Sequence, residues 1–228
     1  MNAQKLSKRL ETVASYVPEG AFLADIGSDH AYLPCYLILE QKITRAVAGE
    51  VVKGPFETAK THVQQLNLEN NISVRLADGL KAIESKDDVD TVTICGMGGP
   101  LIVSILENDP EKLQTVQRLI LQPNIHAKVI REWAMKNGWN VIDEIILEED
   151  NKIYEILVLE RGEMVLTEAE ILLGKHLIEK KSSVFKKKWQ MELENWKKVL
   201  LSLEKAEQTK EIEQKKNEIL EKIQLVQE

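Results

Sequence analysis

The sequence contains few residues of the types that hold metal ions. It has two cysteines, Cys35 and Cys95, far apart in the chain, and four scattered histidines. The common zinc sites need these residues at short, regular spacings, so no metal is expected. Two isolated cysteines also suit a reducing compartment rather than a disulfide framework.

Long hydrophobic runs are also missing. A membrane-spanning helix needs about 18 or more apolar residues in succession, and no such run is present. The opening segment MNAQKLSKRLETV lacks the apolar stretch of a signal peptide. We therefore expect a soluble, cytoplasmic protein with no membrane partner.

Positive charge is not in general excess. The formal net charge is −7, from 30 basic and 37 acidic residues, so the chain is not basic throughout. Residues 163–228 hold 13 lysines and 13 glutamates, and residues 1–162 carry the whole net charge. With 228 residues and 43% hydrophobic content, the chain can form one substantial core and an appendage.

Strand-like and helix-like segments alternate through most of the chain. An amphipathic helix is predicted at 4–17, then five strand–helix repeats, then an antiparallel hairpin around EEDN within 139–162. This alternation predicts an α/β protein with a parallel sheet covered by helices on both faces. Ligands of such sheets bind at the carboxyl ends of the strands, where DIGSDH, AGE, LADG, CGMGG and LQPN fall.

The composition changes near residue 165, beyond which Gly174 is the one glycine and proline is absent. Thr167 and Glu170 have the spacing of a capping box. Apolar residues then recur at alternating spacings of four and three: Trp189, Leu193, Trp196, Leu200 and Leu203. The pattern predicts an α-helical coiled-coil hairpin over 163–228 with its bend near 205–210. One long dimerising helix is the alternative.

The segment LADIGSDHAYLP, residues 23–34, indicates which cofactor the carboxyl ends of the strands can bind. A dinucleotide fingerprint needs three glycines, and only Gly27 is present. Asp29 would repel a phosphate at this turn, and no phosphate-binding P-loop pattern occurs. NAD, FAD and ATP are therefore poor candidates. An adenosine-containing cofactor without phosphate fits better, and S-adenosylmethionine is the obvious one.

Three carboxylates end three successive predicted strands. Asp25 ends the first, Glu50 is suited to bind ribose hydroxyls, and Asp78 is suited to accept a hydrogen bond from an adenine amino group. Each acid alone can instead cap the helix that follows it. Three acids at one sheet edge favour an adenosyl pocket.

Other polar residues near the carboxyl ends of the strands have two interpretations. Asp29 either faces the substrate or caps the next helix, and His30 either contacts the ligand or shapes the turn. Cys95 is either a nucleophile or a small buried residue. His62 and His176 are expected to be ordinary surface or packing residues.

Five segments together are similar to one known family: DIGSDHAYLP, AGEVVKGPFETA, RLADGL, ICGMGG and LQPN. They resemble the bacterial TrmK family of tRNA (adenine(22)-N1)-methyltransferases over roughly residues 1–160, and the helical tail fits the family's coiled-coil extension. The resemblance implies a class I, Rossmann-like methyltransferase with seven strands. It also implies S-adenosylmethionine as cofactor, tRNA as partner, and methylation of adenine 22 in the D-arm.

The resemblance also implies a set of site residues. Asp29 is expected at the target adenine, as the catalytic residue, and Pro123 and Asn124 are expected to bind substrate. The resemblance implies S-adenosylmethionine at Gly27, Glu50, Asp78 and the GMGG loop, Gly96 to Gly99. The candidate cofactor-binding residues are Asp25, Gly27, Ser28, His30, Glu50, Val51, Asp78, Gly79, Gly96, Met97 and Gly98.

The chemistry of the residues agrees with methylation at the ring nitrogen. The motif [DNS]-P-P-[YFW], typical of enzymes that methylate the adenine amino group, is replaced here by CGMGG. Ring N1 already carries a lone pair for direct attack. Asp29 can accept a hydrogen bond from the amino group, orient N1 and stabilise the developing positive charge. Proton removal by Asp29 stays open, and a stacked or paired base must first be exposed.

A lysine-rich segment is the candidate tRNA-binding surface. Residues 175–188 hold six lysines against Glu179, and we expect Lys186, Lys187 and Lys188 to contact phosphates. An ordinary solvated helix face is the alternative. Two other functions stay open from the residues: methylation of a small molecule or protein, and RNA binding with a vestigial cofactor pocket. No protein partner is evident.

Overall fold

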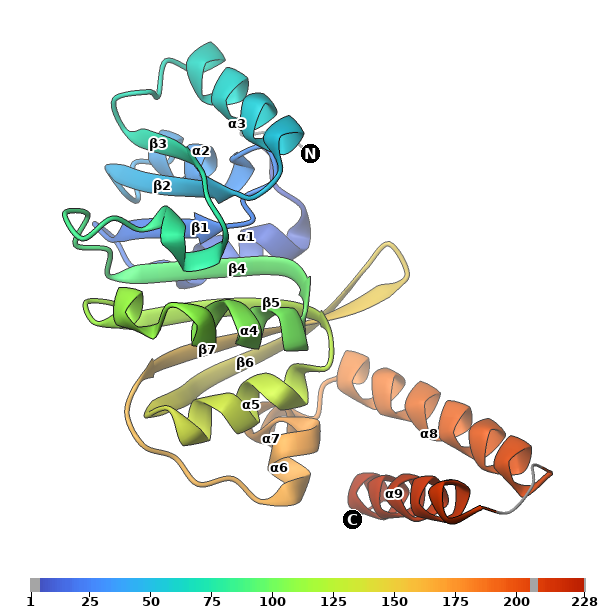
Figure 1. Cartoon of the computed structure of the whole chain (residues 1–228). Coiled ribbons are helices and arrows are strands. Elements are labelled where there is room, and N and C mark those ends of the chain that lie inside the picture. Colours follow the sequence, from blue (N-terminus) through green and yellow to red (C-terminus); the bar gives the residue numbers. More distant parts are fainter. Residues whose placement is uncertain (1–4, 206–208, 228) are drawn as a thin grey trace. The chain divides into compact units, whose positions relative to one another are not determined.

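A seven-stranded sheet runs through the computed structural model, which describes residues 5–205 and 209–227 (Figure 1). The strand order is β3-β2-β1-β4-β5-β7-β6. The first five strands are parallel, whereas β7 is antiparallel to β5 and β6, as the predicted hairpin requires. The bounds are β1 Phe22–Ile26, β2 Arg45–Glu50, β3 Ile72–Leu76, β4 Thr91–Gly98, β5 Arg118–Ile125, β6 Trp139–Glu149 and β7 Lys152–Arg161.

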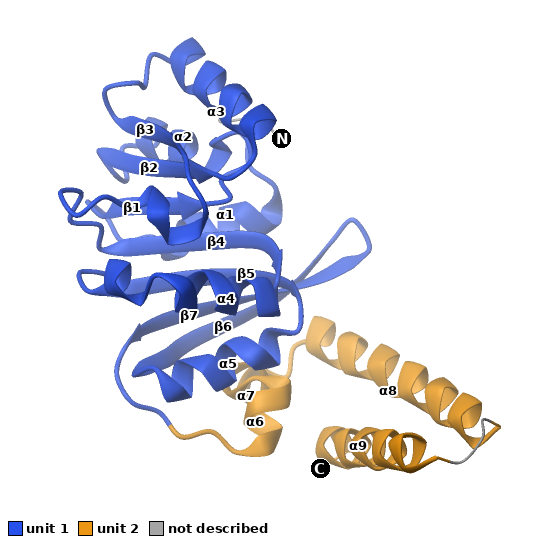
Figure 2. Cartoon of the chain, viewed as in Figure 1, with its two compact units in different colours: residues 1–164 blue, residues 165–228 orange. Residues whose placement is uncertain are grey.

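The chain divides into two compact units, residues 1–164 and 165–228 (Figure 2). Three sequence predictions fall partly outside the described residues. The predicted first helix included residue 4, the predicted bend included 206–208, and the predicted tail included residue 228.

Helices cover both faces of the sheet, as predicted. They are α1 Lys8–Tyr16, α2 Tyr32–Leu39, α3 Lys53–Gln65, α4 Gly99–Asn108 and α5 Ala127–Lys136. Side chains along a strand alternate between the faces. Ala24 and Ile26 of β1 thus join the core beneath α4 and α5, whereas Leu23 joins the core beneath α1, α2 and α3.

The first helix begins later than its apolar spacing predicts. Ser7 is the N-cap of α1, and its hydroxyl accepts a hydrogen bond from the Leu10 N–H. The carboxylate of Glu149 in β6 accepts hydrogen bonds from the N–H groups of Lys8 and Arg9. The start of α1 is therefore attached to the end of a distant strand.

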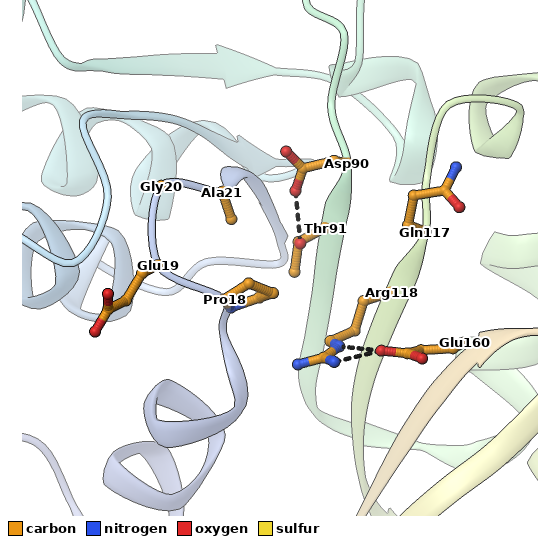
Figure 3. A pocket seen from close by; sticks show the side chains of 9 residues that line it. All are labelled: Pro18, Glu19, Gly20, Ala21, Asp90, Thr91, Gln117, Arg118 and Glu160. Atoms are coloured by element: carbon orange, nitrogen blue, oxygen red, sulfur yellow. Dashed lines mark hydrogen bonds and ion pairs between the residues drawn. The ribbon is translucent and has the colours of Figure 1, made fainter.

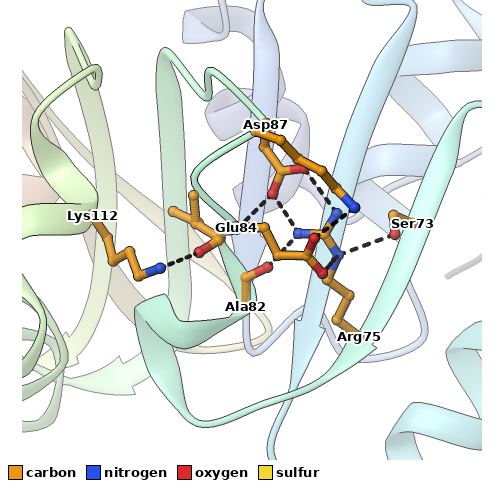
Figure 4. Close-up of polar contacts among 8 residues, drawn as sticks. Ser73, Arg75, Ala82, Glu84, Asp87 and Lys112 are labelled. Atoms are coloured by element: carbon orange, nitrogen blue, oxygen red, sulfur yellow. Dashed lines mark hydrogen bonds and ion pairs between the residues drawn. The ribbon is translucent and has the colours of Figure 1, made fainter.

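The prediction of five strand–helix repeats is wrong at one place. Between β3 and β4 the chain forms a 3-10 turn, η1 Gly79–Ala82, and no α-helix. Figure 4 shows what holds this connection: Arg75 donates hydrogen bonds to Asp87 at 2.9 Å and to the Ala82 carbonyl at 2.7 Å. Residues 84–90 contain one apolar side chain, Val89, too few for the apolar face of a helix.

The second unit is helical, with α6 Glu168–Leu173, α7 Lys175–Lys180, α8 Ser183–Glu204 and α9 Lys210–Gln227. The predicted capping box of Thr167 and Glu170 is confirmed. Helices α8 and α9 contact each other. Trp189, from the predicted apolar pattern, is buried in α8, and Ile219 is buried in α9. The two helices form a helical hairpin, for which coiled-coil geometry stays a prediction. Within the described residues no helix is long and apolar enough to cross a membrane.

Candidate active site

The turn after β1 is attached to the end of β2. The N–H groups of Gly27 and Ser28 both donate to the carbonyl of Gly49, at 2.9 and 3.2 Å. Because the sheet order changes direction between β1 and β4, the carboxyl ends of these strands form the edge where ligands of such sheets bind. Most of the residues predicted from the sequence lie at this edge, which we call the rim.

Asp25 braces the turn from inside. Its side chain is buried, and its two carboxylate oxygens accept hydrogen bonds from the hydroxyls of Ser28, at 2.5 Å, and Thr93, at 2.6 Å. Burial raises the pKa of Asp25 above its ordinary value, although both hydroxyls oppose that shift. Asp25 therefore ties β1 to β4, since Thr93 is its neighbour in the sheet.

The turn itself is backbone-strained. Asp29, His30 and Ala31 have φ angles of +39°, +68° and +56°, in the left-handed region that residues other than glycine seldom adopt. Gly27, at φ +69°, lies so close to Met97 that a Cβ atom would overlap the methionine methyl group. The N-cap of α2 is Ala31, without a side-chain hydrogen bond, so the alternative that Asp29 caps this helix is wrong.

Asp29 is held by its backbone while its carboxylate stays accessible. Its N–H donates to Oε1 of Glu50. The carboxylate is 74% exposed and lies 3.2 Å from Nε2 of His30. The strained turn thus presents an acid to the outside of the rim.

His62 supports this turn from α3. Its Nδ1 lies 2.7 Å from the carbonyl oxygen of His30, and its ring packs edge-on against Tyr32. The Tyr32 ring in turn lies 5.2 Å from that of His30. His62 is therefore a packing residue with a specific partner, whereas His176 pairs with Glu179 within α7.

Glu50 ends β2 with one oxygen engaged and the other available. The side chain is 6% exposed, and burial raises its pKa, opposed by the Asp29 N–H. Its Oε2 has no hydrogen bond from the described residues. Val52 is the N-cap of α3, and the exposed Asp78 makes no capping bond to η1. The helix-capping alternative is therefore wrong for Glu50, whereas Asp78 occupies the N-cap position of η1 without a side-chain bond.

A ligand with hydroxyl donors and no phosphate fits this arrangement. Oε2 of Glu50 can accept a hydrogen bond from a hydroxyl, and Gly27 adds no side chain of its own beside Met97. A phosphate would face the carboxylates of Asp29 and Glu50. The adenosyl and methionyl groups of S-adenosylmethionine meet these requirements. Among the residues described, no His, Cys, Asp or Glu cluster is arranged to hold a metal ion.

A second polar cluster lies at the ends of β4 and β5. The Gly96 N–H donates to Oε1 of Gln122 at 3.0 Å, and its carbonyl accepts from Nδ2 of Asn124 at 2.7 Å. The pairing of the two strands is irregular between Cys95 and Gly98, so Gly96 bulges outward with φ +77°. Pro123 is buried and Asn124 is exposed.

The thiol of Cys95 is a poor nucleophile. Burial, together with the nearby charge of Asp25, raises its pKa, so the reactive thiolate is scarce at neutral pH. Burial also raises the pKa of Cys35 to about 12. The structure thus favours packing over nucleophilic chemistry for both residues.

Some predicted residues lie away from these clusters. Val51 is 63% exposed just beyond β2. The lysines of α8 belong to the second unit, where Nζ of Lys188 lies 4.7 Å from the ring centroid of Trp189. Lys186 and Lys187 are exposed on the same helix.

A hollow of about 270 Å³ lies at the opposite end of the strands from the rim (Figure 3). The amino ends of β1, β4 and β5 border it, and Arg118 donates to Glu160 at 3.0 Å across its wall. It contains none of the predicted site residues.

Sequence reasoning missed three residues that organise the rim. Thr93 binds Asp25, and Gln122 binds Gly96 and Arg9. Gln122 could have been identified from the sequence, because it is a polar residue within the apolar run RLILQP. Arg9 could not have been identified in this way, since it is one of several charged residues on an amphipathic helix.

The sheet order and the acidic, glycine-containing rim define a Rossmann-like fold of the class I methyltransferase type. A family model described as "TrmK: tRNA (adenine(22)-N(1))-methyltransferase" matches residues 23–228. The chain belongs to this family, and the resemblance inferred from its motifs is confirmed.

Relatives match over nearly the whole chain. A Bacillus subtilis tRNA (adenine(22)-N(1))-methyltransferase is 48% identical over 234 residues, covering 100% of this chain and 98% of the relative. The crystal structure of the B. subtilis m1A22 tRNA methyltransferase TrmK has a TM-score of 0.93 at 47% identity, covering 98% of both chains. A Streptococcus pneumoniae relative in complex with S-adenosyl-L-methionine has a TM-score of 0.90 at 44% identity, also covering 98% of both.

Proposed function

We propose that this chain methylates ring N1 of adenine 22 in the D-arm of tRNA, with S-adenosylmethionine as methyl donor. The observation that carries the proposal is the Asp29 carboxylate, which is exposed at the rim while its N–H is bound to Glu50. One residue thereby connects the cofactor-binding acid with the surface that a base approaches. Family membership supports both the reaction and the cofactor.

The cofactor-binding residues act through hydrogen bonds and backbone access. When bound, S-adenosylmethionine supplies the electrophilic methyl group. Glu50 accepts a hydrogen bond from a ribose hydroxyl, and Asp78, exposed beside η1, accepts one from the adenine amino group. Gly27 and Gly96 add no side chain of their own at the rim, where Met97 packs against Gly27 and the Arg9 guanidinium lies beside Gly96.

Asp29 orients the target base and stabilises charge. Its carboxylate accepts a hydrogen bond from the amino group of the target adenine, so that N1 faces the methyl group. The methylated ring is cationic, and a fixed negative charge nearby lowers the free energy of the transition state. His30, at 3.2 Å, limits the conformations of that carboxylate. General-base action is a second role for Asp29.

The two units divide the work in this proposal. Residues 1–162 carry cofactor binding and chemistry, and the coiled-coil tail 163–228 contributes lysines that bind tRNA phosphates. Lys186 and Lys187 support this because they are exposed on α8. The protein acts in the cytoplasm, where its tRNA substrate is found.

The direct test is methylation of unmodified tRNA transcripts with labelled S-adenosylmethionine. Nucleoside mass spectrometry and reverse-transcription arrest identify the modified atom and position. We expect one methyl on N1 of adenine 22. Cofactor binding without transfer to any tRNA would contradict the proposed substrate, and absence of cofactor binding would indicate a vestigial pocket.

Replacing Asp29 with Asn tests the role of its charge. Asparagine tolerates a left-handed backbone but carries no charge. We expect kcat to fall by about 10²-fold, with cofactor affinity nearly unchanged. The matched control is Asp88→Asn, since Asp88 is also exposed with a positive φ of +49° but lies outside the rim. Equal activity of the two variants would remove Asp29 from the mechanism.

A further inference from the structure

Helix α1 places a guanidinium group against the polar cluster at the ends of β4 and β5. Nη1 of Arg9 donates a hydrogen bond to Oε1 of Gln122, the same oxygen that accepts from the Gly96 N–H. Gln122 is fully buried, so its amide has few other partners. A distant helix thus reaches the glycine-rich segment of the rim through one side chain.

The contact reinforces the orientation of two side-chain amides that also bind the Gly96 peptide. Arg9 and the Gly96 N–H are both donors, so Gln122 turns its oxygen toward the two of them. Nε2 of Gln122 then faces Asn124 and donates to its Oδ1 at 3.3 Å. This leaves Nδ2 of Asn124 to donate to the carbonyl of Gly96. The N–H and the carbonyl of Gly96 are therefore held by a network of hydrogen bonds that Arg9 joins at Gln122.

Arg9 is itself held in place. Its guanidinium carbon lies 5.1 Å from the ring centroid of Tyr154, and its backbone N–H donates to Glu149. Both partners belong to the β6–β7 hairpin. A charged donor strengthens the bond to Gln122 relative to a neutral one. The family model begins at residue 23, so α1 lies outside the matched span.

We propose that Arg9 is a positioning residue for methyl transfer. It fixes the amide of Gln122 and, through it, the Gly96 peptide and the exposed amide of Asn124 at the rim where the target adenine enters. Small displacements of groups that position a reacting base cost large factors in rate. This inference rests on the proposed function.

Arg9→Met is the first test, because methionine keeps much of the side-chain length without charge or donors. We expect kcat for tRNA to fall at least tenfold, while KM for tRNA and Kd for S-adenosylmethionine change less than threefold. Arg9→Lys, which restores charge and a donor, should recover part of the loss. A role in stability alone would lower the melting temperature without lowering kcat.

The matched control is Arg45→Met. Arg45 also lies over an aromatic ring, 4.1 Å from the centroid of Phe22, but at the amino end of β2. Its loss should leave kcat unchanged. If Arg9→Met and Arg45→Met have the same kcat on a tRNA that the wild-type protein methylates, the inference is overturned and the proposed function stands.

A double variant tests whether Arg9 acts through Gln122 and Asn124 or affects kcat independently of them. If Arg9 acts through Gln122 on Asn124, then Arg9→Met should lower kcat less than threefold in an Asn124→Ala background. A full tenfold loss of kcat in that background would show that Arg9 does not act through Asn124.

Amide hydrogen exchange supplies a readout that needs no substrate. The Gly96 N–H should exchange at least tenfold faster in Arg9→Met than in Arg45→Met. Unchanged exchange of the Gly96 N–H would overturn the inference whether or not the wild-type protein methylates tRNA. Inactivity of the wild-type protein on tRNA would by itself contradict only the proposed function.

Discussion

At the residue scale, Gly27 combines a strained backbone with a crowded surrounding. Its φ is +69°, and a Cβ atom there would overlap the methyl group of Met97. Gly27→Ala should lower the free energy of unfolding by about 1–3 kcal/mol and weaken S-adenosylmethionine binding at least tenfold, because Met97 must move. Urea denaturation and calorimetry measure the two effects.

Gly20 offers a control for that substitution. It has a similar φ, +76°, but a Cβ atom there meets nothing within 4 Å. Gly20→Ala should therefore show the backbone cost without any change in cofactor affinity. Equal cofactor affinity in the two variants would mean that the rim tolerates movement of Met97.

The buried carboxyl of Asp25 predicts a pH effect on stability. Burial raises its pKa in the folded protein, so the unfolded chain loses this proton at a lower pH than the folded one. The free energy of unfolding should therefore decrease as pH rises from about 4, the unfolded value, through the raised folded pKa. In Asp25→Asn this component should be missing, so the variant gains stability relative to wild type over that window.

The measurement is urea denaturation of wild type and Asp25→Asn across a pH series, with Asp88→Asn as the surface reference. A constant difference between wild type and Asp25→Asn at every pH would contradict the assignment.

At the scale of elements, a buried ionic cluster joins α5 to the terminal hairpin. Nε of Arg131 donates to Glu144 of β6 at 2.6 Å, and Nη2 donates to Glu155 of β7 at 2.7 Å. All three side chains are buried. Arg131→Met leaves two carboxylates without their cation, so the free energy of unfolding should fall by about 3–5 kcal/mol.

The same helix provides the comparison. Lys128 and Glu132 form an exposed pair at 3.4 Å, and Lys128→Met should cost less than about 1 kcal/mol. Chemical denaturation of both variants tests this contrast. Similar losses in the two would show that the Arg131 cluster adds nothing beyond a surface pair.

At the scale of the whole molecule, tRNA binding must overcome a net charge of −7. If residues 186–188 contact phosphates, changing all three lysines to Glu should weaken tRNA binding at least tenfold. The slope of log affinity against log salt should fall by about 2–3. Binding measured at several salt concentrations gives both quantities.

A charge-matched variant separates local contacts from net charge. Lys205, Lys210 and Lys215 are exposed in the same unit, and their replacement by Glu changes the net charge equally. A phosphate-binding surface at 186–188 requires the first variant to bind tRNA more weakly than the second. Equal binding would leave that segment as an ordinary solvated helix face.

The sequence by itself determined the elements and most of the rim. Strand periodicity, helix spacing and turn residues are local properties, so β1 to β7, the capping box at Thr167 and the acids at Asp25 and Glu50 could be read in order. The missing helix between β3 and β4 was the exception. A polar connection closed by Arg75 and Asp87 resembles no regular element in sequence.

Only the tertiary structure decided which side chains meet. The tether of Asp29 to Glu50, the bond of Thr93 to Asp25 and the contact of Arg9 with Gln122 join residues far apart in the chain. Such contacts depend on which strands are neighbours and in which register, and on where the helices pack. Local sequence patterns do not encode these distances, so the acids were predictable and the network that holds them was not.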